Sequence, residues 1–219
     1  MDINLTNLAG SPLFHGISET ELGALIKCAG CTFKAFRPGE TVYSAGEFVR
    51  EIGLVLAGSV QMVKKDAWGR SQILEEKTAG EMFSESSVCG GMGVLPESVI
   101  AAGNTEVMFF DFQRIIVTCS SACVYHTMLI RNMISIFARR NLLLAGKLEH
   151  ITKKTTREKL LSYLSEQAEL SGSSSFSIPL NRQELADYLS VERTALSAEL
   201  SKLKSERILN FRKNNFELL

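Results

Sequence analysis

The sequence lacks the long apolar runs and the signal segments that would place it in or beyond a membrane. Its longest apolar runs, such as 107–110 and 142–145, fall far short of the roughly 18–20 residues that a membrane-spanning helix needs. Residues 1–16 contain neither the basic segment nor the apolar segment of a secretory signal peptide. The 5 cysteines are an odd number and are sparse in 219 residues, which is typical of free thiols in a reducing compartment. We therefore predict a cytoplasmic protein without a membrane segment.

Motifs of the common enzyme classes are also absent. The sequence has no Gly-x-Gly-x-x-Gly, no phosphate-binding Gly-Lys-Ser/Thr loop and no His-Glu-x-x-His, and it has only 3 histidines. These absences predict that the protein is not an enzyme.

An excess of charge of either sign is missing as well, because 24 Lys and Arg balance 24 Asp and Glu. The balance excludes a polycation, but it hides an uneven distribution. Residues 139–219 hold 14 basic and 10 acidic side chains, and residues 1–138 hold 10 basic and 14 acidic ones. Such an asymmetry suggests that the C-terminal part of the chain meets a polyanion.

Glycines divide the segment from about 32 to 112 into short candidate strands. A short helix or helix pair is expected first, at 11–29, with Ser18 as its N-cap and Glu21 at the capping-box position. The strands are then expected at 32–36, 40–43, 52–57, 59–64, 72–76 and 106–112. Short strands separated by glycine turns at roughly 8–12-residue spacing predict an antiparallel barrel or sandwich.

One long amphipathic helix is predicted over 125–152. Its apolar residues recur at steps of three and four: Leu129, Met133, Ile136 or Phe137, Leu143 or Leu144, Leu148 and Ile151. A helix of this length between two compact modules favours a dimer seam. Packing against its own barrel is the alternative.

The C-terminal segment carries the most specific motif. After a helix at 156–170 and a short strand at 176–180, Asn181 can cap a helix with Glu184 three residues later. A turn at Ser190 precedes a second helix over 192–204, and a hairpin is expected over 208–219. The apolar positions that would pack the two helices are Leu185, Ala186, Leu189, Val191, Leu196, Leu200 and Leu203. This pattern predicts a winged helix-turn-helix, with a plain helical hairpin as the alternative.

Two positions depart from the usual motif. Ser190 stands at a turn position that glycine often holds, and a serine can still adopt a turn. Glu199 stands in an interior apolar position near the end of the motif, where Leu200 can replace it.

The second helix would place its N-terminal turns in the major groove of DNA. Arg193 has the fork to bind a guanine edge, and Thr194 or Ser197 can serve a base edge or a phosphate. The other candidates are phosphate contacts, namely Arg182, Gln183, Lys202, Arg212 and Lys213.

The order of these parts resembles the Crp/Fnr family of bacterial transcriptional regulators over nearly the whole chain. The segments 37–40 (Arg-Pro-Gly-Glu), 80–85 (Gly-Glu-Met-Phe-Ser-Glu), 182–186 (Arg-Gln-Glu-Leu-Ala) and 191–197 (Val-Glu-Arg-Thr-Ala-Leu-Ser) lie where that family has its counterparts. The run 119–126 resembles a Firmicutes-type subgroup.

The resemblance implies an α+β protein with a jelly-roll-like β-roll of the cyclic-nucleotide-binding-domain type over 1–124, a dimerisation helix over 125–152, and a winged helix-turn-helix over 153–219. It also implies a homodimer on double-stranded DNA with a pseudo-palindromic operator, an effector in or near the β-roll, and RNA polymerase as a partner if the protein is an activator.

The resemblance leaves the effector unknown, and no cofactor is predicted with certainty. Family members that bind cyclic AMP use a Gly-Glu motif and then an Arg-Ser or Arg-Thr about ten residues later. Here Ser84 and Glu85 could stand for the first half, while Ser98 falls in the second half without an arginine. Between Arg70 and Arg114 the only cation is Lys77. Because an unpaired buried phosphate is costly, we expect a small effector other than cyclic AMP.

The cysteines leave three interpretations open. Cys28 and Cys31 have redox or metal spacing, and Cys119, Cys123 and His126 would share one helix face. The third closely spaced cysteine of the family's iron–sulfur members is absent after Cys31. A structural role, a thiol redox sensor and a weak metal site are thus the alternatives. The competing function is a cyclic-nucleotide-type or thiol/metal redox sensor that acts through protein contacts.

Overall fold

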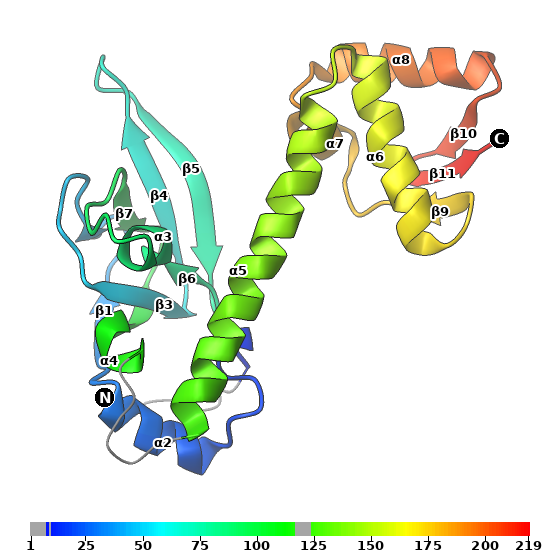
Figure 1. The fold of residues 1–219 in the computed structure, drawn as a ribbon. Helices are drawn as coiled ribbons and strands as arrows, with labels where there is room; N and C mark the ends of the chain where they lie inside the picture. The colour runs from blue at the N-terminus through cyan, green and yellow to red at the C-terminus, as the bar shows by residue number, and fades with distance from the viewer. Residues whose placement is uncertain (1–7, 9, 117–123) are drawn as a thin grey trace. The chain divides into compact units, whose positions relative to one another are not determined.

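The computed structural model describes Leu8, residues 10–116 and residues 124–219. The contacts divide the chain into two compact units, Met1–Phe137 and Ala138–Leu219. Figure 1 shows the first unit as two layers of strands with helices at one end, and the second as a small helical unit with a short sheet. Within the described part of the chain, no helix is long and apolar enough to cross a membrane.

Two four-stranded antiparallel sheets form the first unit. One has the order β1-β8-β3-β6, formed by Thr32–Phe36, Thr105–Asp111, Glu51–Ala57 and Met82–Phe83. The other has the order β2-β7-β4-β5, formed by Thr41–Tyr43, Ser98–Ala101, Ser59–Lys65 and Ser71–Thr78. The predicted antiparallel sandwich is confirmed, and the two strands not predicted, β6 and β7, fall in the region around 80–101.

Aromatic rings fill the interior between the two sheets. The rings of Phe36, Tyr43 and Phe83 each meet the ring of Phe109 edge to face, with centroids 5.7–6.3 Å apart. Gly53 is required beside them, because a Cβ there would overlap the ring of Phe83. The interior of the roll is therefore packed by its own side chains.

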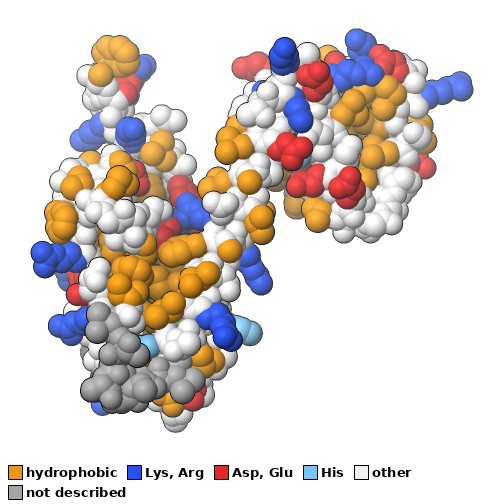
Figure 2. Space-filling view, in the orientation of Figure 1, with side chains coloured by type: hydrophobic (Ala, Val, Ile, Leu, Met, Phe, Trp, Pro, Cys, Tyr) orange, Lys and Arg blue, Asp and Glu red, His pale blue; other side chains and the backbone are white. Residues whose placement is uncertain are grey.

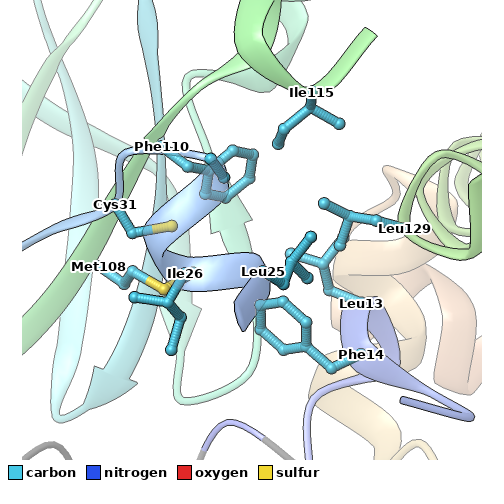
Figure 3. A pocket seen from close by; sticks show the side chains of 10 residues that line it. Leu13, Phe14, Leu25, Ile26, Cys31, Met108, Phe110, Ile115 and Leu129 are labelled. Atoms are coloured by element: carbon cyan, nitrogen blue, oxygen red, sulfur yellow. The ribbon is translucent and has the colours of Figure 1, made fainter. Parts of the chain in front are cut away.

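Helices close one end of this sandwich. They are the 3₁₀ turn η1 (Pro12–Phe14), α2 (Glu19–Cys28), α4 (Phe112–Ile116) and the first turns of α5 (Val124–Ile151), whereas α3 (Glu85–Cys89) lies against β3. Helix α2 begins as predicted, because the Glu21 carboxylate accepts a hydrogen bond of 2.7 Å from the Ser18 backbone N–H. Side chains from η1, α2, β8, α4 and α5 meet around a cavity of about 10 Å³, shown in Figure 3, which has room for one water at most.

The 28-residue helix α5 changes surroundings along its length. Leu129 and Met133 are buried in the core of the first unit, and the Asn132 amide donates to the carbonyl oxygens of Leu13 and His15 at 2.9 Å. In the second unit the same helix leaves its leucines exposed, with Leu142 72% and Leu143 74% accessible. The predicted apolar stripe is thus one helix in the structure, but only part of it is available for a dimer.

The second unit packs three helices on a three-stranded sheet. Its helices are α6 (Thr156–Ser171), α7 (Arg182–Leu189) and α8 (Arg193–Ser205). Its sheet has the order β10-β11-β9, formed by Leu209–Arg212, Asn215–Leu218 and Ser175–Ser177. The predicted apolar positions form its core, because Leu185, Ala186, Leu189, Leu196, Leu200 and Leu203 are all fully buried. The helix-turn-helix with its wing is therefore present.

Candidate nucleic-acid interface

The first helix of the motif begins with the predicted capping box. The side chain of Asn181 accepts hydrogen bonds from the backbone N–H groups of Gln183 and Glu184, at 2.9 and 3.1 Å. The Glu184 carboxylate accepts in return from the Asn181 N–H at 2.7 Å. These bonds satisfy the free donors at the start of α7 and fix where it begins.

The turn between the two helices is stabilised by hydrogen bonds from a neighbouring helix, α6. Ser190 adopts the left-handed conformation, φ 52°, that glycine usually supplies, so the prediction that a serine can make this turn is confirmed. The Lys159 ammonium of α6 donates to the carbonyl oxygens of Leu189 and Ser190 at 3.3 and 3.4 Å. Lys159 was not predicted, because its partners lie about thirty residues away and no local pattern marks them.

The second helix, α8, presents one buried and one exposed face. Leu196, Leu200 and Leu203 form the buried side. Of the predicted DNA contacts, Arg193, Thr194 and Lys202 are exposed and Ser197 is half-exposed. The predicted residues therefore lie on the face of α8 that the rest of the unit leaves open.

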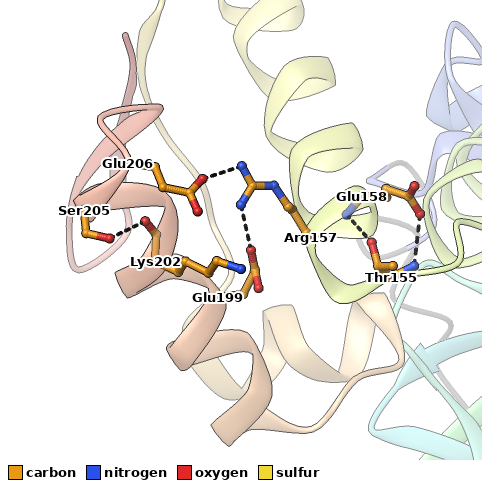
Figure 4. A network of polar contacts seen from close by, with 7 residues as sticks. All are labelled: Thr155, Arg157, Glu158, Glu199, Lys202, Ser205 and Glu206. Atoms are coloured by element: carbon orange, nitrogen blue, oxygen red, sulfur yellow. Dashed lines mark hydrogen bonds and ion pairs between the residues drawn. The ribbon is translucent and has the colours of Figure 1, made fainter.

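An ion-pair network fixes α8 to α6, as Figure 4 shows. Arg157 contacts Glu199 at 3.3 Å and Glu206 at 2.6 Å. Its hydrogen bond holds the pKa of the Glu206 carboxyl below its usual range. Leu200 takes the buried position as predicted, and Glu199 serves as a partner for Arg157 in place of an apolar contact.

The wing carries two further predicted contacts. Arg212 ends β10 and Lys213 lies in the two-residue turn before β11, and both side chains are exposed. Lys213 adopts a left-handed conformation, φ 55°. Gln183 is also exposed, at the start of α7, where its amide donates to Asp187 at 2.9 Å.

Arg182 is half-buried between α7 and the wing. Its guanidinium lies 5.2 Å from the centroid of the Phe211 ring and 5.9 Å from that of Phe216, and it donates to the Lys213 carbonyl oxygen at 3.4 Å. Burial lowers the pKa of Arg182, and the nearby charge of Arg193 lowers it further.

A buried histidine joins the end of α5 to α6. The two ring nitrogens of His150 lie 2.9 Å from the Ser162 hydroxyl and 3.0 Å from a Glu166 carboxylate oxygen. The His150 ring also meets the Tyr163 ring edge to face. The sequence gives no signal for this cluster, because a histidine near a helix end has no characteristic pattern.

In the first unit, which we call the sensor unit, the predicted pocket residues Ser84 and Ser98 are hydrogen-bonded to backbone groups of the protein. The Ser84 hydroxyl donates to the Glu51 carbonyl oxygen at 3.1 Å, and the Ser98 hydroxyl accepts from the Ala45 N–H at 3.0 Å. Glu85 is buried at the start of α3. Lys77, only 5% exposed, pairs with Glu75 at 2.6 Å, so its charge is already neutralised.

The predicted thiol and metal residues are only partly described. Cys119 and Cys123 lie outside the described residues, whereas His126 is buried in α5 with no hydrogen-bond partner for its ring nitrogens in the described part. Burial raises the pKa of the Cys31 thiol to about 12. Over the ranges that the structure describes, no group of three or more His, Cys, Asp or Glu side chains could hold a metal ion.

Family models match both units of the chain. The cyclic nucleotide-binding domain matches residues 33–121, and the Crp-like helix-turn-helix domain matches residues 158–219. A roll of this kind joined to this helix-turn-helix defines a DNA-binding transcriptional regulator with a cyclic-nucleotide-binding-type sensor domain. Together the two matches span more than half of the sequence, and the chain belongs to the Crp/Fnr family.

Solved structures share this fold at low sequence identity. The catabolite activator protein of Thermus thermophilus is 21% identical, with 95% of this chain and 94% of that one covered and a TM-score of 0.50. DNR from Pseudomonas aeruginosa is 18% identical, with coverages of 100% and 95% and a TM-score of 0.51. A CooA mutant from Carboxydothermus hydrogenoformans is 18% identical, with coverages of 100% and 92% and a TM-score of 0.52. No curated protein matches the sequence.

Proposed function

We propose that the protein binds a pseudo-palindromic DNA operator as a homodimer and that a small effector other than cyclic AMP controls it through the β-roll. The observation that carries the proposal is the open face of α8, where Arg193, Thr194 and Ser197 project opposite a fully buried leucine face. Among the described residues Arg193 has no acidic partner, and an unpaired guanidinium is suited to a guanine edge.

The remaining contacts are assigned to the DNA backbone. Gln183, Lys202, Arg212 and Lys213 are exposed on α7, α8 and the wing, and they suit phosphates, which position the protein without reading sequence. If transcription is activated, RNA polymerase is the further partner. Assignment to the Firmicutes-type subgroup belongs to the same proposal and rests on the run 119–126.

The exposed leucines of α5 support the dimer. Leu142, Leu143, Leu144 and Leu148 are each more than half accessible on a single helix, and Figure 2 shows hydrophobic side chains at the surface along it. Contiguous apolar side chains on a long helix are typical of a surface that a second copy covers. A dimer would also present two recognition helices to the two halves of an operator.

Several features of the sensor unit argue against cyclic AMP. The one cation in the sequence between Arg70 and Arg114 is Lys77, and Glu75 already neutralises it. Aromatic rings pack the interior of the roll, and the hydroxyls of Ser84 and Ser98 are bound to backbone groups. The segment where the family's phosphate-binding arginine is expected therefore offers a cyclic phosphate no unpaired cation, and burial of a phosphate without such a partner is costly in free energy.

Selection of bound DNA from a random pool, with and without cell extract, tests the proposal. Recovery of an inverted repeat is expected, and dependence on extract would reveal an effector. Binding that lacks steep salt dependence would contradict a DNA regulator and favour a sensor that acts through protein contacts. Calorimetric titration with cyclic AMP is expected to give no binding, and saturable binding would overturn that part of the proposal.

Two substitutions test the register of the recognition helix. Arg193→Ala should relax base preference at one position of each half-site, by about 1–3 kcal/mol. Lys202→Ala should weaken all sequences alike and lower the salt slope by about one contact. If Arg193→Ala leaves sequence preference intact, the recognition residues have been assigned wrongly.

A further inference from the structure

The sequence suggests Arg182 as a phosphate contact, but its surroundings point to another role. Its guanidinium lies over two rings of the wing, Phe211 and Phe216, and donates to the backbone carbonyl of Lys213 at the tip of the wing. A guanidinium stacked on aromatic faces is held in one orientation by both dispersion and the charge of the ring quadrupole. Arg182 therefore joins the first turn of α7 directly to the loop that carries the wing's cations.

Phe211 is held by a second cation, from the recognition helix. The Lys204 ammonium lies 5.4 Å from the centroid of the same ring that Arg182 covers at 5.2 Å. The Phe211 ring also stacks with that of Phe216, with planes 27° apart, and Phe216 stacks in turn with Phe176 of β9. The wing is thus tied to both helices of the motif through one half-buried ring.

The wing needs such an attachment. Strands β10 and β11 are four residues each, and a hairpin this short has little stability of its own. Its turn consists of Lys213 and Asn214, with Lys213 at φ 55°. The bond from Arg182 reaches the carbonyl oxygen of that turn, so it restrains the backbone from which the side chains of Arg212 and Lys213 project.

We propose that Arg182 and Phe211 are positioning residues that set the pose of the wing relative to α7 and α8, so that the phosphate contacts of Arg212 and Lys213 depend on them. The inference rests on the proposed DNA binding. It gives Arg182 an indirect role in affinity, through the wing, in place of a direct contact with DNA.

The test uses Phe211→Leu in the full-length protein, because this change removes no charge. The measured quantities are the affinity for the selected duplex and the slope of log affinity against log salt, which is about 0.9 per phosphate contact. If the ring positions the wing, Phe211→Leu lowers the slope by up to two contacts and the affinity by about tenfold at moderate salt. An unchanged slope in a folded variant overturns the proposal.

A double-substitution cycle makes the same test through Arg182. If Arg182 positions the wing, Arg182→Gln and Lys213→Ala are strongly non-additive, and Lys213→Ala has little further effect in the Arg182→Gln protein. If Arg182 touches a phosphate itself, the two losses add, and the proposal fails. Arg182 is half-buried in the first turn of α7, and the cycle through Arg182→Gln provides a second, independent measurement if Phe211→Leu fails to fold.

Lys202→Ala is the matched control. It removes an exposed cation of α8 that, among the described residues, makes no cation–π contact with the wing's rings, and its effect should add to that of Arg182→Gln. If the unsubstituted protein shows no salt-dependent duplex binding, both the proposed function and this inference fall. If it selects an inverted repeat and the cycle is additive, only the role of Arg182 and Phe211 falls.

Discussion

The candidate sites of the two units differ in the state of their ionisable groups. In the first unit, three ionisable groups near the predicted pocket and the thiol pair are buried or paired: Lys77 is bound to Glu75, Glu85 is buried, and burial raises the pKa of Cys31. In the DNA-binding unit, Arg193 and Lys213 point to solvent, and no acidic partner for either lies within the described residues. Unpaired cations at a surface are available to a polyanion, whereas a buried, paired charge is available only to a ligand that displaces its present partner.

This contrast explains how a chain of zero net charge can bind DNA. The excess of positive charge in residues 139–219 is modest, so non-specific affinity should be weak. We therefore expect affinity to come from the accurate placing of a few cations and from their doubling in the proposed dimer. The roles proposed for Arg182, Phe211 and the α5 leucines all serve that end.

The largest expected effect concerns the thiols of the sensor unit. With a pKa of about 12 against 9.0 for an ordinary thiol, Cys31 should hold about a thousandfold less thiolate than the same residue in the unfolded chain. Alkylation by iodoacetamide at pH 8, followed by mass spectrometry, should label Cys31 slowly in the native protein and quickly in denaturant. Cys89, with a pKa of about 11, should be intermediate. Equal rates for Cys31 in both states would revive a thiol redox sensor in this unit.

Dimerisation should respond next most strongly. Leu144→Glu places a charge on the exposed leucine face of α5, where a partner helix would bury it without a counter-ion. We expect a monomer in sedimentation experiments and an affinity for the inverted repeat that falls by about a hundredfold, because each half-site then binds alone. Leu170→Glu is the matched control, since Leu170 is an exposed leucine on α6. A dimer that survives Leu144→Glu with full affinity would place the seam elsewhere.

The sequence predicts most of the fold because the signals for its helices are local. The capping boxes of Ser18 with Glu21 and of Asn181 with Glu184 span three residues each, and both occur as predicted. The positions of most strands were predicted from the spacing of the glycines, which is also a local signal because each glycine marks the turn next to a strand. The strand β6 was missed because it has only two residues, too few for a period to show.

What could not be predicted depends on contacts between distant segments. Arg157 meets Glu199 across 42 residues of sequence, and no spacing rule connects them. Leu129 and Leu144 occupy the same apolar pattern in α5, yet one is buried and the other is exposed, because periodicity does not say which neighbour covers a face. The cation–π contacts of Arg182 also join distant segments of the chain, because Phe211 and Phe216 lie about thirty residues away. The sequence around Arg182 therefore suggested only a phosphate contact.

His150 is an exception to the contrast, because it is a polar group buried in the DNA-binding unit. His150→Ala removes its contacts with Ser162 and Glu166 and should lower the free energy of unfolding by about 1–3 kcal/mol. Urea unfolding followed by circular dichroism measures this. His15→Ala, at an exposed position, should change stability by less than about 0.5 kcal/mol. Equal stabilities for the two variants would mean that the histidine cluster does not hold the end of α5.

The smallest expected effect is a pH dependence of the same unit. Arg157 holds the pKa of the Glu206 carboxyl below its usual value of 4.5, so the ionised carboxylate is favoured in the folded state. The resulting stabilisation is present at pH values above 4.5, the pKa of the carboxyl in the unfolded chain. It is lost as the pH falls through the lowered pKa of Glu206 in the folded protein. Between neutral and acid pH, the unfolding temperature should therefore fall more steeply for the unsubstituted protein than for Arg157→Gln, which lacks the cation that pairs with Glu206. Parallel curves would show that this surface ion pair, although short, adds nothing to the attachment of α8, and that only the apolar core and the wing hold the recognition helix in place.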